Sequence, residues 1–403
     1  MNADDFPTPD VDVDSVDPET LKDRIDAGED VTLLDARMQS DYDEWRIDGD
    51  NVMSINIPYF EFLEDDIDEG VLERIPDDRE VTVLCAKGGA SEYVAGTLAE
   101  RGYDVNHLED GMNGWASIYE AVEVERYDGA GTLLQYQRPS SGCLGYLLYH
   151  DGEAAIIDPL RAFTDRYLDD AADLGVDLQY ALDTHIHADH ISKGRTLADR
   201  LDVPYHLGKP AETRDPDFEF EPIEPNDVVE LGDVDIKAVH TPGHTTGMTS
   251  YLVDDEALLT GDTLFVESIG RTELQFADQD ARDGARVQYE TLHNVIMTES
   301  NDVKVLPGHF SVTNDGEYID VTPGQPMFST VGYIWENNEI LRLSEDEFVE
   351  HMFDNLPSKP PNYEQVIATN AGEYQPEDDD EETELELGPN RCAATADSAV
   401  ADD

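Results

Sequence analysis

Basic residues are scarce in this chain. Of its 403 residues only 25 are lysine or arginine, against 93 aspartates and glutamates, which leaves a formal net charge of −68. A surface of this charge repels nucleic acid and anionic membranes, so neither is an expected partner. The acidic residues are spread along the whole chain, and we interpret this as adaptation to high salt, where carboxylates hold water and ions screen their repulsion.

Cysteines and long apolar runs are also few. Cys85, Cys143 and Cys392 are far apart and odd in number, which excludes a disulfide framework and indicates a reducing compartment. No apolar run approaches the ~18 residues of a membrane span, and the first residues lack the basic start and apolar core of a signal peptide. We therefore expect a cytoplasmic protein. With 39% hydrophobic residues, the length suggests two or three domains.

One short segment, residues 184–190, contains three histidines and an aspartate. Imidazole nitrogens and carboxylate oxygens are ligands for zinc or ferrous iron. The preceding Leu178–Leu182 is predicted to be a strand, which places these side chains at a strand's C-terminal end, where α/β folds form their sites. The segment reads Thr184, His185, Ile186, His187, Ala188, Asp189, His190.

The same arrangement recurs three times downstream. Short strand-forming runs at 234–239, 257–260 and 303–306 are each followed by a histidine or aspartate, with a glycine immediately before it that allows a sharp turn. A single histidine after a strand is usually structural, but recurrence at four strand ends indicates one metal-binding pocket. The three further candidates are His244, Asp262 and His309.

The N-terminal part presents a different chemistry. The strand Val81–Leu84 leads to Cys85 in a glycine-rich loop, and a helix is predicted over Glu92–Glu100. Backbone N–H groups and the helix dipole favour a thiolate there, and Lys87 adds a cation. From the loop alone, a small buried hydrophobic residue is an equally good interpretation of the cysteine.

Residues 14–120 resemble the rhodanese family. That resemblance implies a domain over 14–123, with a parallel sheet and flanking helices, in which Cys85 carries sulfane sulfur as a persulfide and Lys87, Gly88 and Gly89 contact the substrate. Ala90 stands where many rhodaneses have a basic residue. The similarity is carried by Leu34-Asp35-Ala36-Arg37, Asn56-Ile57-Pro58, the Cys85 loop and Gly111-Met112-Asn113-Gly114-Trp115.

Residues 130–370 resemble the metallo-β-lactamase superfamily, whose motif is H-x-H-x-D-H followed by His, Asp and His at later strand ends. The resemblance implies an αββα sandwich. In two-metal members of the superfamily, His185, His187 and His244 would hold one metal. Asp189, His190 and His309 would hold the other, and Asp262 would bridge the two.

Three features are similar to the persulfide dioxygenase branch: the order His187-Ala188-Asp189-His190-Ile191, the segment Gly270-Arg271-Thr272, and the fusion to a sulfur-carrying domain. This resemblance implies one Fe(II) per chain, held by His185, His244 and Asp262, with the other motif residues around it. O2 would oxidise a low-molecular-weight thiol persulfide to sulfite and thiol, and Arg271 would contact the thiol's carboxylate. Cys85 would supply sulfane sulfur, or pass it to sulfite to give thiosulfate.

Two other hypotheses stay open. All seven ligands of a binuclear zinc or iron site are present, which suits a glyoxalase II-like thioester hydrolase. A sulfur-carrier or scaffold protein whose metal is only structural is the other hypothesis.

Phe310 and Ser311 stand where glutathione-using persulfide dioxygenases have Asp-Tyr, which favours a carrier thiol other than glutathione. We expect residues 371–403 to form a disordered acidic tail. The sequence gives no role to Cys392 in this tail. It also leaves open whether the protein forms a homo-oligomer.

Overall fold

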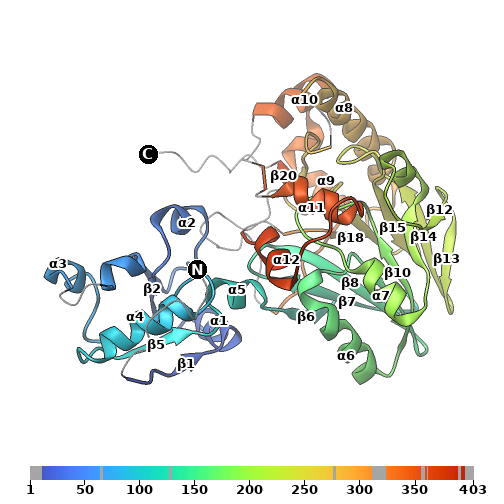
Figure 1. Cartoon of the computed structure of the whole chain (residues 1–403). Coiled ribbons are helices and arrows are strands. Elements are labelled where there is room, and N and C mark those ends of the chain that lie inside the picture. The colour runs from blue at the N-terminus through green and yellow to red at the C-terminus, as the bar shows by residue number, and fades with distance from the viewer. Residues whose placement is uncertain are drawn as a thin grey trace.

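A computed structural model describes two domains joined by a short connection (Figure 1). The N-terminal domain lies beside the larger C-terminal one and contacts it, for example through the 2.7 Å hydrogen bond from Nε of Arg138 to the carbonyl oxygen of Ala116. The last described residues return to the larger domain. The described residues are 11–63, 67–125, 127, 129–275, 278–310, 324–354, 359–360, 362–388 and 392–394.

The N-terminal domain is built on a five-stranded parallel sheet in the order β1-β5-β4-β2-β3. Successive residues of β2 point to opposite faces: Leu33 packs with α1 and α5, and Leu34 packs with α4. The predicted α/β domain, a parallel sheet with flanking helices, is confirmed. Its elements are β1 (Ser15–Val16), α1 (Pro18–Asp26), β2 (Val31–Asp35), α2 (Gln39–Glu44), β3 (Val52–Asn56), η2 (Tyr59–Phe62), α3 (Glu69–Leu72), β4 (Val81–Leu84), α4 (Gly89–Ala99), β5 (Val105–Leu108) and α5 (Gly111–Ala116).

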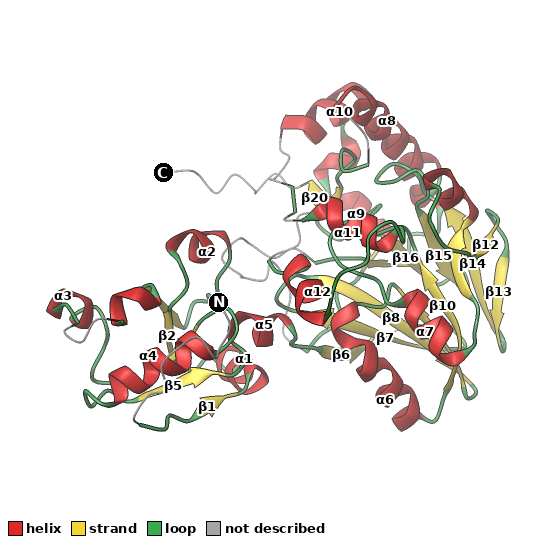
Figure 2. Ribbon diagram, viewed as in Figure 1, coloured by secondary structure: helices red, strands yellow, loops and turns green. Residues whose placement is uncertain are grey.

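The second domain has two large sheets packed face to face (Figure 2). The first has the order β12-β11-β10-β9-β8-β7-β6 and the second β13-β14-β15-β16-β18-β19. Their strands are β6 (Glu120–Glu123), β7 (Thr132–Arg138), β8 (Cys143–His150), β9 (Glu153–Ile157), β10 (Asp177–Asp183), β11 (Tyr205–Gly208), β12 (Glu221–Ile223), β13 (Val228–Leu231), β14 (Val234–His240), β15 (Thr249–Val253), β16 (Ala257–Gly261), β18 (Lys304–Pro307) and β19 (Ser329–Thr330).

Helices cover the outer face of each sheet. One apolar cluster fills the space between the sheets, a second lies under α6 and α7, and a third lies under α8, α9 and α10. This is the predicted αββα sandwich. The helices and 3-10 turns are η3 (Arg161–Phe163), α6 (Thr164–Leu174), α7 (Gly194–Leu201), η4 (Lys209–Arg214), α8 (Asp278–Asn294), η5 (Ile296–Thr298), α9 (Val331–Asn337), η6 (Glu339–Arg342), α10 (Glu345–Asp354), α11 (Tyr363–Asn370) and α12 (Asp379–Leu385).

Two segments differ from expectation. The predicted N-terminal domain, 14–123, includes β6, but β6 pairs with β7 in the second domain's sheet. Within the tail of 371–403, expected to be disordered, the structure forms α12. The reason is that Asp378 caps this helix and Glu386 is buried against arginines, so the acidic run is locally neutralised. Most of the tail beyond 388 lies outside the described residues.

A last small sheet joins the ends of the second domain. The strands β17 (Ile269–Gly270) and β20 (Ala393–Ala394) pair antiparallel, which brings the C-terminal segment against the loop that follows β16. Among the helices that the structure describes, none combines the length and the apolar character needed to cross a lipid bilayer.

Candidate metal centre

The candidate ligands come from the ends of four strands, as predicted. The histidine-rich turn follows β10, and His244, Asp262 and His309 follow β14, β16 and β18. Glycine is needed at the last of these turns because a Cβ on Gly308 would lie 2.6 Å from Oδ1 of Asp262. Gly261 has a φ of +47°, in the left-handed region.

His185, His244 and Asp262 form the first group of ligand atoms. One atom from each lies within 4.8 Å of the others, and all three residues are buried. Nε2 of His185 is 3.9 Å and Nε2 of His244 is 3.5 Å from Oδ2 of Asp262. These separations are too long for hydrogen bonds, but they suit atoms that surround one metal at about 2.0–2.2 Å each.

The histidines of this group are held with Nε2 directed inward. Nδ1 of His244 lies 2.6 Å from the carbonyl oxygen of Arg271, and Nδ1 of His185 lies 3.0 Å from Oγ1 of Thr184. Burial lowers the pKa of both imidazoles, so they are neutral at pH 7. A neutral imidazole with an occupied Nδ1 is the form that binds a metal through Nε2.

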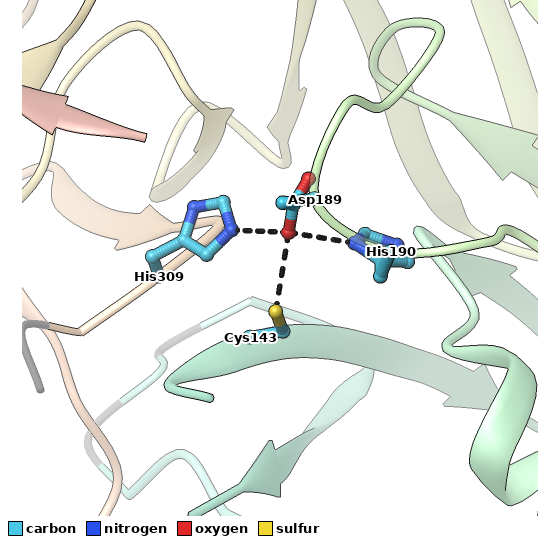
Figure 3. Close-up of side chains that lie close together, drawn as sticks. All are labelled: Cys143, Asp189, His190 and His309. Carbon is cyan, nitrogen blue, oxygen red and sulfur yellow. Dashed lines mark hydrogen bonds and ion pairs between the residues drawn. The ribbon is translucent and has the colours of Figure 1, made fainter. Parts of the chain in front are cut away.

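Asp189 organises a second group. Its Oδ2 lies 2.7 Å from Nε2 of His309 and 3.0 Å from Nδ1 of His190, and it accepts from Sγ of Cys143 at 3.1 Å (Figure 3). Burial lowers the pKa of His309, but Asp262 and Asp189 raise it more, to well above its usual range. The second group is therefore an ionic cluster beside the first.

His187 has other neighbours. Its Nε2 lies 3.1 Å from Oδ1 of Asp158, which also accepts from the backbone N–H of Thr184 at 2.7 Å. His187 thus groups with Asp158 and Asp183, and it does not join His185 and His244 as the two-metal pattern implies. Asp158 was not anticipated, although its place in Ile157-Asp158-Pro159, at a strand end, is the same signal as elsewhere.

Asn370 is a second residue that the sequence did not indicate. Its side-chain amide donates to the carbonyl oxygens of His187 and His190, at 3.0 and 2.7 Å, and its Oδ1 accepts from the N–H of Ser192. It comes from α11, far along the chain, and no local pattern distinguishes it. Asn370 fixes the backbone of the histidine-rich turn.

Arg271 and Cys392 lie next to each other at the same centre. The buried guanidinium of Arg271 forms an ion pair with Glu273, and its backbone N–H donates to the carbonyl oxygen of Cys392 at 2.9 Å. Cys392 is buried, and its Sγ lies within 4.8 Å of ligand atoms of Asp189, Asp262 and His309. Two of the three cysteines, Cys143 and Cys392, therefore lie at this centre, and Cys143 also packs in the apolar cluster under α6 and α7.

The candidate sulfur-carrying residue, Cys85, lies in the N-terminal domain. Cys85 follows β4 at the N-terminus of α4, is 5% exposed, and its Sγ lies 3.4 Å from Oγ of Ser91. Gly88 has a φ of +90°, which lets the loop turn back. Nζ of Lys87 forms an ion pair with Glu384 of α12 at 2.7 Å, so this acidic residue partly compensates the positive charge beside Cys85.

Buried polar atoms indicate that the centre suits a metal. Nε2 of His185, Oδ2 of Asp262, Nε2 of His190 and Oδ1 of Asp189 are all buried without a hydrogen-bond partner. Unsatisfied buried polar atoms are costly, and a cation would satisfy the first two together. Nitrogen and oxygen donors of this kind fit ferrous iron or zinc.

Comparison with known proteins agrees with this geometry. The model of the metallo-beta-lactamase superfamily matches residues 140–309, and that of the rhodanese-like domain matches residues 17–118. Over 247 residues the chain is 31% identical to "Persulfide dioxygenase ETHE1, mitochondrial" of Homo sapiens, covering 60% of this chain and 89% of that protein. The chain belongs to the metallo-beta-lactamase superfamily.

Other proteins match this chain over fewer residues or with lower sequence identity. A hydroxyacylglutathione hydrolase of Acidiphilium cryptum is 34% identical over 126 residues, 31% of this chain and 51% of that protein. A metallo-beta-lactamase structure from Staphylococcus aureus is 26% identical, with a TM-score of 0.54, covering 62% of this chain and 76% of that one. Superfamily membership fixes the fold, and the reaction depends on the site.

Proposed function

We propose that this protein is a persulfide dioxygenase with one ferrous ion, coupled to a sulfurtransferase. The observation that carries the proposal is the grouping of His185, His244 and Asp262 around one point. Two histidines and one carboxylate on one side of a metal are the ligand set of non-haem Fe(II) oxygenases. The similarity to the human persulfide dioxygenase supports the same activity.

The overall reaction takes a persulfide RSSH, O2 and water to sulfite, RSH and protons. When bound, ferrous iron with open coordination positions would supply the activation of O2 toward sulfur. The chain's residues would then position the ion and handle the protons. Asp262 would be the negatively charged ligand beside the two neutral histidines. His309 would keep a proton at Nε2, beside Asp189, and donate it to the leaving thiolate.

In the N-terminal domain, Cys85 would carry the sulfane sulfur. The end of β4 and the N-terminus of α4 place its Sγ 3.4 Å from Ser91 Oγ, at a point where the helix dipole would stabilise a negative persulfide. Gly88 and Gly89 would present backbone N–H groups to the substrate, and Lys87 would add a positive charge. A fused donor raises the local concentration of sulfur for the metal centre.

A binuclear thioester hydrolase is the second candidate. Asp189, His190 and His309 lie beside the first group, and Asp262 lies between the two sets, as a bridging ligand would. The similarity to the hydroxyacylglutathione hydrolase favours this alternative, but it covers only half of that protein.

The two candidates differ in their need for O2. We expect iron-loaded protein to consume O2 with glutathione persulfide as a test substrate, and His244→Ala and Asp262→Ala to lose the activity by at least ~100-fold, because each removes a ligand. The matched control is His240→Ala, which removes a histidine at the end of β14 whose Nε2 lies 3.2 Å from the carbonyl oxygen of Thr246. Hydrolysis of S-lactoyl glutathione without O2, together with no O2 uptake on the persulfide, would contradict the dioxygenase and support the thioester hydrolase.

A further inference from the structure

Three consecutive residues at the end of α12 join the two domains. Leu385 packs with Ile191 of the metal domain, and Glu386 accepts from the backbone N–H of Ile191 at 2.5 Å. Leu387 packs against the apolar cluster that lies under α1 and α5 of the N-terminal domain. Helix α12 is therefore held where the two domains meet (Figure 1).

This placement brings two carboxylates of α12 to the Cys85 loop. Asp380 and Glu384 are four residues apart, so they share one face of the helix. Lys87, two residues after Cys85, has its Nζ 2.7 Å from Glu384 and 3.7 Å from Asp380. The hydrogen bond to Glu384 raises the pKa of Lys87, so the ammonium group stays protonated and the ion pair persists at neutral pH.

The loop contains no second cation for an anionic substrate. Of the residues from Ala86 to Ser91, only Lys87 is charged. Arg37 follows β2 at the same edge of the sheet, but it is buried, and its Nη2 donates to Asp35 and to the carbonyl oxygen of Trp45, both at 2.6 Å. One ammonium group between two carboxylates leaves one negative charge in excess beside Cys85.

The charge of a substrate at Cys85 is therefore decisive. The N-terminus of α4 and the backbone N–H groups of the loop attract negative charge, which suits the single charge of a persulfide. A second negative charge on the substrate meets no uncompensated cation in the loop, and Asp380 and Glu384 repel it. The same two carboxylates attract an ammonium group on the substrate.

We propose that the Cys85 site selects its sulfur donor by charge, and that Glu384 is the residue that determines this specificity. The favoured donor is a persulfide RSSH whose thiol part carries an ammonium group, and the thiosulfate dianion is disfavoured. In the transfer, the Cys85 thiolate attacks the terminal sulfur of RSSH, the S–S bond of the donor breaks, and RS⁻ leaves. Cys85 becomes a persulfide, so the exchange needs no oxidant.

The charge selection rests on the proposed function, in which Cys85 carries sulfane sulfur, and it names the class of substrate. It also favours one direction of sulfur flow. Fully ionised sulfite is a dianion like thiosulfate, so Asp380 and Glu384 oppose its approach to a Cys85 persulfide. The favoured acceptor of sulfur from Cys85 is then another thiol.

The test measures sulfur loading of Cys85 in metal-free protein without O2. The donors are the persulfides of cysteamine and of 2-mercaptoethanol, which differ by an ammonium group, and thiosulfate. Peptide mass spectrometry follows the sulfur added to Cys85 at ~0.1 M KCl, where exposed charges still act over about 10 Å. Dividing each rate by that of mercaptoethanol persulfide with the same protein removes differences in the reactivity of the thiol.

The informative variant is Glu384→Gln. We expect its relative rate to rise about 3–10-fold with thiosulfate and to fall about 2–3-fold with cysteamine persulfide, because a dianion responds more strongly than a monocation. Asp379→Asn is the matched control and should change neither rate. It removes the same charge from the same helix, but adjacent positions of a helix point in different directions.

Salt distinguishes an effect of charge from a change in packing. The difference between Glu384→Gln and the natural chain should shrink at 1 M KCl, where the Debye length is about 3 Å, because the selection acts through exposed charges. Circular dichroism of each variant verifies that it is folded under both conditions.

Equal relative rates in Glu384→Gln and the natural chain would overturn the selection, and so would a difference that 1 M KCl leaves unchanged. If none of the donors adds sulfur to Cys85, the sulfur-carrying role of Cys85 is wrong, and the selection with it. The dioxygenase activity is tested separately, by O2 uptake with free glutathione persulfide, so its failure is distinguishable from both.

Discussion

Neighbouring histidines of the same turn have different roles at this centre. Nε2 of His185 is buried without a hydrogen-bond partner and faces Asp262, whereas Nε2 of His187 faces Asp158 at 3.1 Å. The two rings lie close together, with centroids 4.1 Å apart, but Asp158 occupies Nε2 of His187 and leaves its Nδ1 as the buried atom without a hydrogen-bond partner. Asp158 also accepts from Thr184, so it ties His187 to the end of β10.

This difference predicts a contrast between two alanine variants. His185→Ala removes a ligand, so we expect it to lose tightly bound metal. His187→Ala removes a neighbour of the ligands, so we expect it to keep one metal per chain while affinity or turnover falls about 10–100-fold. Metal titration of both variants, with the metal content measured after dialysis, checks this. Equal metal loss in both would place His187 among the ligands.

At this scale the sequence predicted most of the centre. His185, His244, Asp262 and His309 could be expected together because strand ends and glycine turns are local patterns. Cys392 and Asn370 could not, because each reaches the centre through contacts with residues more than a hundred positions away, and such contacts leave no local trace.

Helix α12 is the element that the sequence misjudged. A run of acidic residues predicts disorder because its charges repel, but here cations from three places compensate them. Lys193 pairs with Glu382, Lys87 with Glu384, and Arg161 with Glu386. These cations come from segments far away in the sequence, so the neutralisation of the acidic run depends on the tertiary structure. The composition of the run alone cannot predict it.

The burial of Glu386 makes the docking of α12 dependent on pH. Burial raises the pKa of Glu386, but Arg161 and Arg138 lower it more, so it lies below the usual 4.5. A depressed pKa contributes stability above pH 4.5 that is lost as pH falls through the folded value. We expect Glu386→Gln to lower the free energy of opening of α12 at pH 7 by about 3–5 kcal/mol.

Hydrogen exchange of the α12 amides, measured from pH 4 to pH 7 by mass spectrometry, checks this prediction. The difference between the natural chain and Glu386→Gln should be constant at the higher pH values and shrink below 4.5. Glu336→Gln, at an exposed glutamate of α9, is the matched control and should change nothing. A helix that exchanges equally fast in both proteins would contradict the anchoring role.

The whole molecule is dominated by negative charge. With 93 acidic and 25 basic residues, the folded chain holds repelling carboxylates close together. Salt shortens the range of this repulsion, since the Debye length falls from about 10 Å at 0.1 M to about 3 Å at 1 M. The fold is compatible with such a surface because its apolar clusters lie between and beneath the sheets.

We therefore propose that stability rises with salt. The midpoint of thermal unfolding should increase by several degrees between 0.1 and 1 M KCl, because screening favours the compact state. Circular dichroism at fixed pH measures it, and sucrose at equal osmolality controls for solvent exclusion. A midpoint that is flat or falls with KCl would contradict adaptation to high salt.

The central claim is that His185, His244 and Asp262 share one ferrous ion. Anomalous diffraction from crystals of protein loaded with iron in the absence of O2, with data on both sides of the iron and zinc edges, tests it most directly. The account predicts a single iron peak within bonding distance of these three side chains. Two zinc peaks, with Asp262 between them and Asp189, His190 and His309 around the second, would contradict it.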